Sequence, residues 1–361
     1  NFFIDNINQL TGSAISEISV TLPLGISFYT FQIVSYIIDL YRGKIKAEHS
    51  LLNLGTYLCM FPQLIAGPIV VYGLVAKELQ ERTYSLEKFE EGIRIFILGL
   101  GSKVLIANNV GMLWDDVAQI GYTHISMPLA WLGMLAYTLQ IYFDFNGYSL
   151  MAIGLGKMLG FDLPQNFNFP YISRSITEFW RRWHMTLSGW FREYLYIPLG
   201  GNRRGKARNY LNLFIVWAAT GFWHGAAWNF ICWGLLFFVI LTAEKEGLGI
   251  FLEKHVIFSR VYTLLLIGFS WMIFAITDPL QIAVYFQRLF SFEPGADAVY
   301  YLKNYGVILA IGSILSTPVL KGFYEKKKKS AAGVIASILI LLASVAYLTD
   351  AAYNPFLYFR F

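Results

Sequence analysis

Long apolar runs separated by short polar segments dominate the chain. The run 331–348 contains no charged residue. Other apolar runs lie near 20–38, 93–110, 128–145, 210–223, 227–243, 261–277 and 304–320. A helix that crosses a bilayer needs about 20 mainly apolar residues. The pattern therefore predicts an all-α, polytopic integral membrane protein.

Three further apolar stretches are interrupted by glycine, proline and charged residues, at 51–76, 147–160 and 165–200. These interruptions predict short, tilted or re-entrant segments in place of complete spans. Irregular backbone is tolerated at membrane depth only where protein or a water-filled cavity covers it. We therefore expect the broken pieces to line a cavity within one domain, 1–361.

The composition excludes a soluble globular domain. Hydrophobic residues make up 56% of the chain and charged residues 14%, whereas soluble domains have about 45–50% and about 25%. Basic residues gather at 203–208 and 321–329, each beside an apolar run. Such runs mark the cytoplasmic side of a membrane protein. They predict no nucleic-acid binding, and they place the tail 350–361 outside the cell.

The two cysteines, Cys59 and Cys232, each lie inside an apolar run. We expect them to be small buried hydrophobic residues and not a disulfide or a metal pair. The sequence has no Cys/His spacing typical of a metal site, no phosphate-binding loop and no dinucleotide-binding motif. A metal ion is therefore not expected.

Two histidines lie in membrane-embedded sequence, where an ionisable group is a functional candidate. His224 lies in TGFWHGAAWNF, between Gly221 and Gly225, which let the backbone turn or approach a ligand closely. A buried neutral imidazole can act as the general base for a hydroxyl nucleophile. The alternative is a histidine at a helix end that bonds a carbonyl, and the spacing alone favours this alternative.

The other histidine, His184, lies in FWRRWHMTLSGWFREYLYIPLGGNRRG (179–205). Arg181 and Arg182 precede it and would form a basic wall for a phosphate-bearing donor. The alternative is an amphipathic helix at the headgroup boundary, since aromatic residues recur at helical intervals. Asp144 lies in the apolar segment IYFDFNGYS and would pair with an arginine to stabilise the fold, or contact substrate.

Four segments carry a family resemblance: FPQLIAGPIV (61–70), YFDFNGYS (142–149), the 179–205 segment and GFWHGAAWNF (221–230). They resemble, in this order, the membrane-bound O-acyltransferases, above all the bacterial branch typified by the alginate O-acetylation membrane protein. The resemblance runs from about residue 20 to the C-terminus. It implies broken helices that line a funnel or tunnel, and a chain shorter at its N-terminus than its relatives.

The resemblance also implies a reaction: acyl transfer, with acetyl as the expected group, from a cytoplasmic thioester such as acetyl-CoA or an acyl carrier. The acceptor would be an extracytoplasmic polysaccharide such as alginate, cellulose or peptidoglycan, reached through a secreted or periplasmic acetyltransferase. No bound cofactor is implied. The family's signature histidine aligns with His224, and a second one aligns with His184. Trp223, Asn229, Asp144 and the two arginines form the expected substrate-binding set.

The C-terminal sequence NPFLYFRF resembles the aromatic tail of relatives that export acyl groups. This resemblance implies that Tyr358 carries the acyl group as an ester between the donor and the partner, while anchoring at the membrane interface is the alternative. Other functions remain open: D-alanyl transfer to teichoic acid, transport without covalent chemistry, or a scaffold for a secreted acetyltransferase. The expected location is the bacterial plasma membrane.

Overall fold

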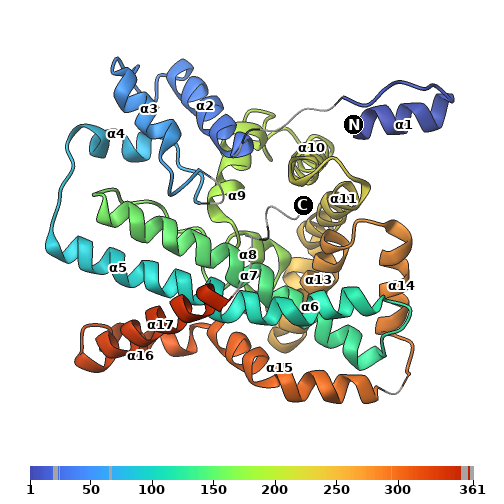
Figure 1. Cartoon of the computed structure of the whole chain (residues 1–361). Coiled ribbons are helices and arrows are strands. Elements are labelled where there is room, and N and C mark those ends of the chain that lie inside the picture. Colours follow the sequence, from blue (N-terminus) through green and yellow to red (C-terminus); the bar gives the residue numbers. More distant parts are fainter. Residues whose placement is uncertain (19–22, 24, 65–66, 294, 351–356, 358–361) are drawn as a thin grey trace.

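The computed structural model describes residues 1–18, 23, 25–64, 67–293, 295–350 and 357. These residues form helices and no strand, as predicted (Figure 1). In the first half the elements are α1 (Phe2–Thr11), α2 (Ile26–Tyr41), α3 (Leu51–Cys59), α4 (Tyr72–Gln80), α5 (Leu86–Gly101), η1 (Ser102–Ala107), α6 (Asn108–Ile120), α7 (Met127–Met158) and η2 (Pro170–Ile172). The remaining elements are α8 (Ile176–Trp180), α9 (Met185–Phe191), η3 (Arg192–Tyr196), α10 (Lys206–His224), α11 (Trp228–Ala243), η4 (Glu244–Leu248), α12 (Gly249–Lys254), α13 (Val256–Ala275), α14 (Pro279–Leu289), α15 (Ala296–Leu315), η5 (Pro318–Leu320), α16 (Lys321–Lys327) and α17 (Ala331–Asp350).

Four helical segments are long and apolar enough to cross a bilayer: Leu86–Ile120, Val256–Ala275, Ala296–Leu315 and Ala331–Thr349. The first joins α5 and α6 through the π-helical turn η1. The runs predicted at 128–145, 210–223 and 227–243 are also helical and lie within α7, α10 and α11. The run predicted at 20–38 lies partly outside the described residues.

The prediction of broken segments is correct at two places and wrong at one. The stretch 51–76 contains α3 and the start of α4, and 165–200 divides into the short elements η2, α8, α9 and η3. The stretch 147–160, in contrast, is mostly the second half of α7, which runs without a break from Met127 to Met158. Its glycines do not end the helix because they serve as its contact surface with α5.

Glycines bring α5 and α7 together along an antiparallel seam. A Cβ atom added to Gly99 would lie 2.6 Å from the carbonyl oxygen of Gly147, and one added to Gly154 would lie 2.6 Å from that of Gly92. Small residues of this kind let membrane helices approach until their backbones touch. The seam fixes α5, η1 and α7 as one unit.

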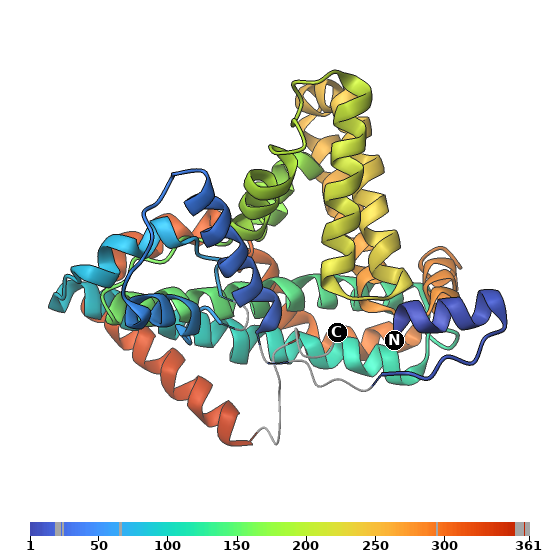
Figure 2. The ribbon, with the colours of Figure 1, turned by 90° about the horizontal axis from the view of Figure 1, so that it is seen from above.

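The helices lie in two differently oriented groups. Figure 2 shows α5, α6 and α7 running side by side, with the hairpin of α10 and α11 standing at a steep angle to them. The aromatic core lies between these groups and includes Trp180, Trp183, Trp233 and Trp271. The prediction that the cysteines are buried is wrong, because Cys59 and Cys232 are both exposed on the outer sides of α3 and α11.

Candidate functional site

His224 is the last residue of α10, at the turn of the α10–α11 hairpin. The hairpin is closed by glycine: a Cβ on Gly221 would lie 2.4 Å from the carbonyl oxygen of Phe230, and one on Gly225 would lie 2.4 Å from the Phe230 ring. The backbone at Gly225 is extended, with φ of 169°. Of the two roles expected for these glycines, a turn and close approach to a ligand, the structure shows the turn, because both admit α11.

An aromatic cage surrounds the partly buried imidazole of His224. The ring centroids of Trp223, Trp233 and Phe274 lie 4.8, 5.1 and 5.0 Å from the centroid of His224, and all three rings are arranged edge to face with it. Within the described part of the chain, the side chain of His224 makes no hydrogen bond to a carbonyl or any other group. Such a histidine is held by ring packing and keeps its nitrogens available to a substrate.

His184 is held in a different way, by a hydrogen-bond network. It is 3% exposed and lies immediately before α9 with a left-handed φ of 44°, which is unusual for a residue other than glycine. Its Nδ1 lies 3.2 Å from Oδ1 of Asn166. Oδ1 is an acceptor, so Nδ1 carries the proton and Nε2 is the acceptor nitrogen of the neutral ring.

Asn166 is itself fixed on both sides. Its Nδ2 donates to Oγ of Ser149 at 3.0 Å, and its Oδ1 also accepts from Oγ1 of Thr186 at 2.9 Å. The Thr186 hydroxyl oxygen in turn accepts from the backbone N–H of Ile69 at 2.9 Å. Three separate parts of the chain thus hold His184 in one orientation.

The two histidines meet at a single tryptophan. Trp223 lies with its ring centroid 4.8 Å from His224 and 6.4 Å from His184. The indole N–H groups of Trp223 and Trp233 are buried and have no hydrogen-bond partner in the described chain. Buried N–H groups are nearly always paired in folded proteins. Two unpaired donors beside two histidines indicate a place for an oxygen atom of a ligand.

The other predicted substrate-binding residues contribute less to this cage. Asn229 is buried, and its Nδ2 donates to the carbonyl oxygen of Phe274 at 3.1 Å, so its amide already ties α11 to α13. Arg182 binds Glu178 at 2.9 Å and the carbonyl oxygen of Asn168 at 3.2 Å. Arg181 is exposed, and its side chain has no polar partner in the described chain.

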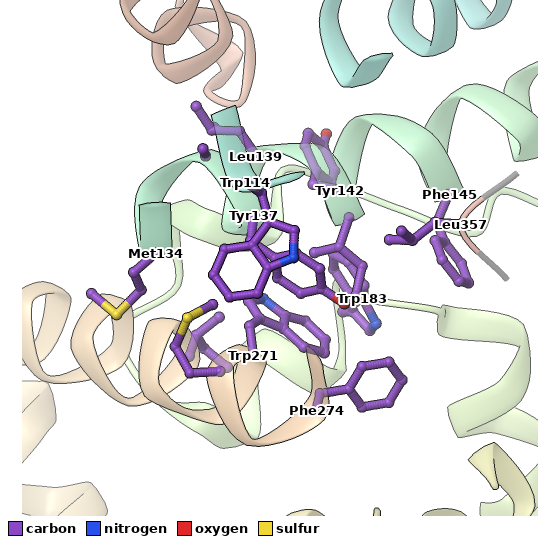
Figure 3. Packing of buried hydrophobic residues seen from close by; sticks show 14 of the residues in the cluster. Trp114, Met134, Tyr137, Leu139, Tyr142, Phe145, Trp183, Trp271, Phe274 and Leu357 are labelled. Carbon is purple, nitrogen blue, oxygen red and sulfur yellow. The ribbon is translucent and has the colours of Figure 1, made fainter. Parts of the chain in front are cut away.

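Asp144 is buried in α7 and is paired, as predicted, although its partner is a lysine and not an arginine. Its Oδ1 forms an ion pair with Nζ of Lys103, which lies in η1. Its Oδ2 accepts a hydrogen bond of 2.8 Å from the backbone N–H of Leu357. Figure 3 shows Leu357 beside Phe145 in the aromatic core. Tyr358 lies outside the described residues.

Sequence reasoning missed Asn166 and Lys103. Asn166 carried no motif, although it is a polar residue within an interrupted apolar stretch. Lys103 carried a clear signal, because it is a cation in the middle of the predicted span 93–110. Such a residue is a functional candidate on the same physical ground as His224.

A surface pocket of about 470 Å³ lies far from the histidines, beside Lys206, Lys245 and Glu246. It sits at the first turn of α10, and His224 ends the same helix of 19 residues, about 27 Å away at the usual rise per residue. Lys206 is paired with Glu246 at 2.8 Å. The pocket therefore belongs to the basic loop and not to the histidine cage.

Comparisons with known proteins identify the family of the chain. The model of the membrane-bound O-acyltransferase family matches residues 44–287, a range that contains both histidines. The "Probable alginate O-acetylase AlgI" of Pseudomonas aeruginosa is 44% identical over 299 residues, which cover 81% of this chain and 57% of that protein. The protein of the same name from Pseudomonas putida is 38% identical over 396 residues, covering 100% and 80%.

The peptidoglycan O-acetyltransferase of Helicobacter pylori is 37% identical over 308 residues, which cover 76% of this chain and 58% of that protein. The chain thus spans less than two thirds of the P. aeruginosa and H. pylori relatives. The family match nevertheless extends over most of its length and includes the histidine cage and the α5–α7 seam. This chain belongs to the membrane-bound O-acyltransferase family.

Proposed function

We propose that this protein is an O-acyltransferase that carries an acetyl group across the bacterial plasma membrane. The donor is a cytoplasmic acyl thioester, and the final acceptor is a hydroxyl of an extracytoplasmic polysaccharide. One observation carries the proposal: His184 and His224 lie against the same indole ring, beside two unpaired indole N–H groups. The relatives named as O-acetylases and O-acetyltransferases support the acetyl group.

In the proposed reaction His224 is the general base. It accepts the proton of the attacking hydroxyl while that oxygen bonds to the thioester carbonyl carbon. The carbon–sulfur bond then breaks, and the thiol leaves with the proton that His224 returns. His184, whose Nε2 is an acceptor, positions the donor or the hydroxyl. Its loss should therefore reduce turnover less than loss of His224.

The tetrahedral intermediate needs donors about 2.7–3.1 Å from its oxyanion. We assign this task to the indole N–H groups of Trp223 and Trp233, because both are buried and unpaired. Asn229 is a weaker candidate, since its amide is bound to the Phe274 carbonyl. Arg181, together with the exposed Arg203 and Arg204, is better suited to attract a phosphate-bearing donor to the protein surface.

The first acceptor in this scheme is the hydroxyl of Tyr358. The docking of Leu357 in the core supports this step, because the next residue is only about 3.8 Å away along the chain, measured between Cα atoms. The phenol needs a base to become a nucleophile, and His224 would supply it. A secreted or periplasmic acetyltransferase would then take the acetyl group from the tyrosine ester to the polysaccharide.

The experiment is acyl transfer in liposomes that contain the purified protein and labelled acetyl-CoA. His224→Ala should lower covalent labelling by about 10²–10⁴-fold, and Tyr358→Phe should abolish it. His255→Ala is the matched control, because His255 is exposed and lies between α12 and α13, away from the cage. Labelling within a few-fold of wild type in the His224 variant would refute the proposed base.

The same assay separates the remaining alternatives. A transporter without covalent chemistry would move a labelled group without forming an ester on the protein. If the protein is only a scaffold, the His224→Ala variant would still support polymer acetylation in cells. A D-alanyl transferase would label with a D-alanyl thioester and not with an acetyl thioester. Polymer acetylation in cells should fall with His224→Ala by the same factor as labelling in liposomes.

A further inference from the structure

The C-terminal segment enters the core at Leu357. This residue is 4% exposed and belongs to the same buried cluster as Phe145, Trp183 and Phe274. Helix α17 ends at Asp350 on the outside of the helical layer (Figure 2), whereas Leu357 lies in the buried cluster. The backbone N–H of Leu357 donates a hydrogen bond to Oδ2 of Asp144 at 2.8 Å.

Asp144 is suited to hold a peptide backbone. Its side chain is 1% exposed, and that of Lys103 is 14% exposed. A buried carboxylate is costly unless a cation and hydrogen-bond donors both satisfy it. Lys103 neutralises one oxygen, and the other oxygen remains directed at the segment that contains Leu357. Asp144 binds a backbone N–H group, so this contact does not depend on the side chain at position 357.

The seam between α5 and α7 creates this arrangement. A Cβ on Gly147 would lie 3.0 Å from the backbone nitrogen of Lys103. Because glycine has no Cβ, η1 lies directly against α7 at Gly147, about one helical turn from Asp144. The π-helical turn η1 widens the helix at the same point, and single π turns are frequent at functional sites.

We infer that Asp144 and Lys103 form a clamp that docks the C-terminal segment by its backbone and thereby positions it for acyl transfer. The docking half of this inference stands by itself, and the half that concerns acyl transfer rests on the proposed function. Asp144 is a positioning residue in this scheme, because it acts through the backbone of the segment at Leu357. If the clamp is removed, the C-terminal segment should be released from the site.

The test measures how fast a cysteine at position 357 reacts with a water-soluble maleimide in purified, detergent-solubilised protein. The background carries Cys59→Ser and Cys232→Ser, since both native cysteines are exposed. Leu357→Cys should be protected, because the clamp holds the backbone. Rapid labelling of Leu357→Cys with an intact clamp would overturn the inference.

Two clamp variants then release the segment. Asp144→Leu combined with Lys103→Met replaces the ion pair by apolar groups, an exchange that buried pairs often tolerate. It should raise the labelling rate of Leu357→Cys at least about tenfold, since a hydrogen bond to a charged group is lost. Asp144→Asn keeps the shape and one acceptor oxygen but removes the charge that neutralises Lys103, so it should give an intermediate rate with some loss of stability. Unchanged rates in both variants would contradict a clamp.

The control is Asp39→Asn. Asp39 is a second buried carboxylate in an apolar helix, α2, where it accepts from the hydroxyl of Tyr194 at 2.6 Å, whereas Leu357 donates to Asp144. This variant should leave the labelling rate at position 357 unchanged. A rise equal to that of the Asp144 variants would indicate general loosening and would also overturn the clamp.

Acyl transfer is measured separately, in the same variants without Leu357→Cys. If the clamp positions the segment for chemistry, transfer should fall in proportion to the loss of protection, and His224 should remain essential. Released but fully active protein would overturn the functional half of the inference. If His224→Ala is fully active while Asp144 protects position 357, the proposed base is wrong and the docking half of the inference stands.

Discussion

At the scale of single residues, Asn166 determines what His184 can do. It accepts from Nδ1 and so leaves Nε2 as the acceptor nitrogen of the ring. It also forms hydrogen bonds with Ser149 and Thr186, so that one amide binds three neighbouring side chains. The left-handed backbone of His184 is a strained conformation, and this network is what maintains it.

Asn166→Ala should therefore lower both activity and stability. The substitution leaves buried donors unpaired, which costs about 1–3 kcal/mol each, and it frees the imidazole to rotate. The measurement is thermal unfolding together with liposome labelling. Asn168→Ala is the matched control in the same segment. Within the described chain Asn168 forms hydrogen bonds through its backbone alone, to Arg182. An Asn166→Ala protein with wild-type labelling would exclude a role for this network.

A second prediction concerns the unpaired indole of Trp233. Trp233→Phe keeps an aromatic ring beside His224 but removes the N–H group. Loss of one oxyanion donor typically lowers the rate by about 10²–10³-fold; no hydrogen bond is lost within the described chain, but Trp233 is fully buried, so the smaller ring should also lower stability through the cavity that it leaves. Trp228→Phe is the control, since Trp228 is exposed and its N–H binds Asn6 at 3.2 Å. Equal labelling by the two variants would remove the indole from the mechanism.

At the scale of secondary-structure elements, glycines decide which helices touch. The sequence treated Gly147 and Gly154 as interruptions, since glycine weakens an isolated helix. In the fold they are the contact surface with α5 and the helix continues through them. A pattern of apolar residues cannot reveal this, because the partner helix lies more than 40 residues earlier in the sequence.

Gly99→Ala should destabilise the protein by about 1–3 kcal/mol, the usual cost of overpacking. The new Cβ would lie 2.6 Å from the Gly147 carbonyl oxygen, a backbone atom that cannot move without shifting α7. Thermal unfolding in detergent measures the effect. Gly189→Ala, in α9, is the control because its Cβ would meet no atom within 4 Å. If the two alanine variants unfold at the same temperature, the α5–α7 seam is not a close contact.

The candidate site shows the same division between what sequence can and cannot predict. His184 and His224 were predictable, because each is an ionisable residue in membrane-embedded sequence. Their common neighbour Trp223 joins the two only after folding, since it lies 39 positions after His184 in the sequence and meets it through a ring contact. Lys103 and Asp144 were readable as intramembrane charges, but their pairing depends on the glycine seam and could not be derived from local pattern.

At the scale of the whole molecule, the two basic runs define an orientation. The runs 203–208 and 321–329 should both face the cytoplasm, and the connection between α14 and α15 should then face outward. Phe292→Cys and Lys326→Cys test this, because Phe292 is 84% exposed and Lys326 is also exposed. Both are placed in a background without the native cysteines.

In intact cells a membrane-impermeant maleimide should label Phe292→Cys and spare Lys326→Cys. Permeabilised cells should show labelling of both, which controls for accessibility. The physical reason is the preference of lysine and arginine for the cytoplasmic side. Labelling of Lys326→Cys in intact cells would reverse the orientation and, with it, the side on which the thioester donor must arrive.

The docking of Leu357 has a pharmacological consequence. A segment bound within its own protein is a tethered ligand, and a short tether gives an effective concentration in the millimolar range. A free peptide that copies the terminal sequence must compete against that concentration, so it would be a weak inhibitor. A compact molecule that binds the Asp144–Lys103 pair faces the same competitor, so it must bind far more tightly than the free peptide to trap the enzyme without its own C-terminus in place.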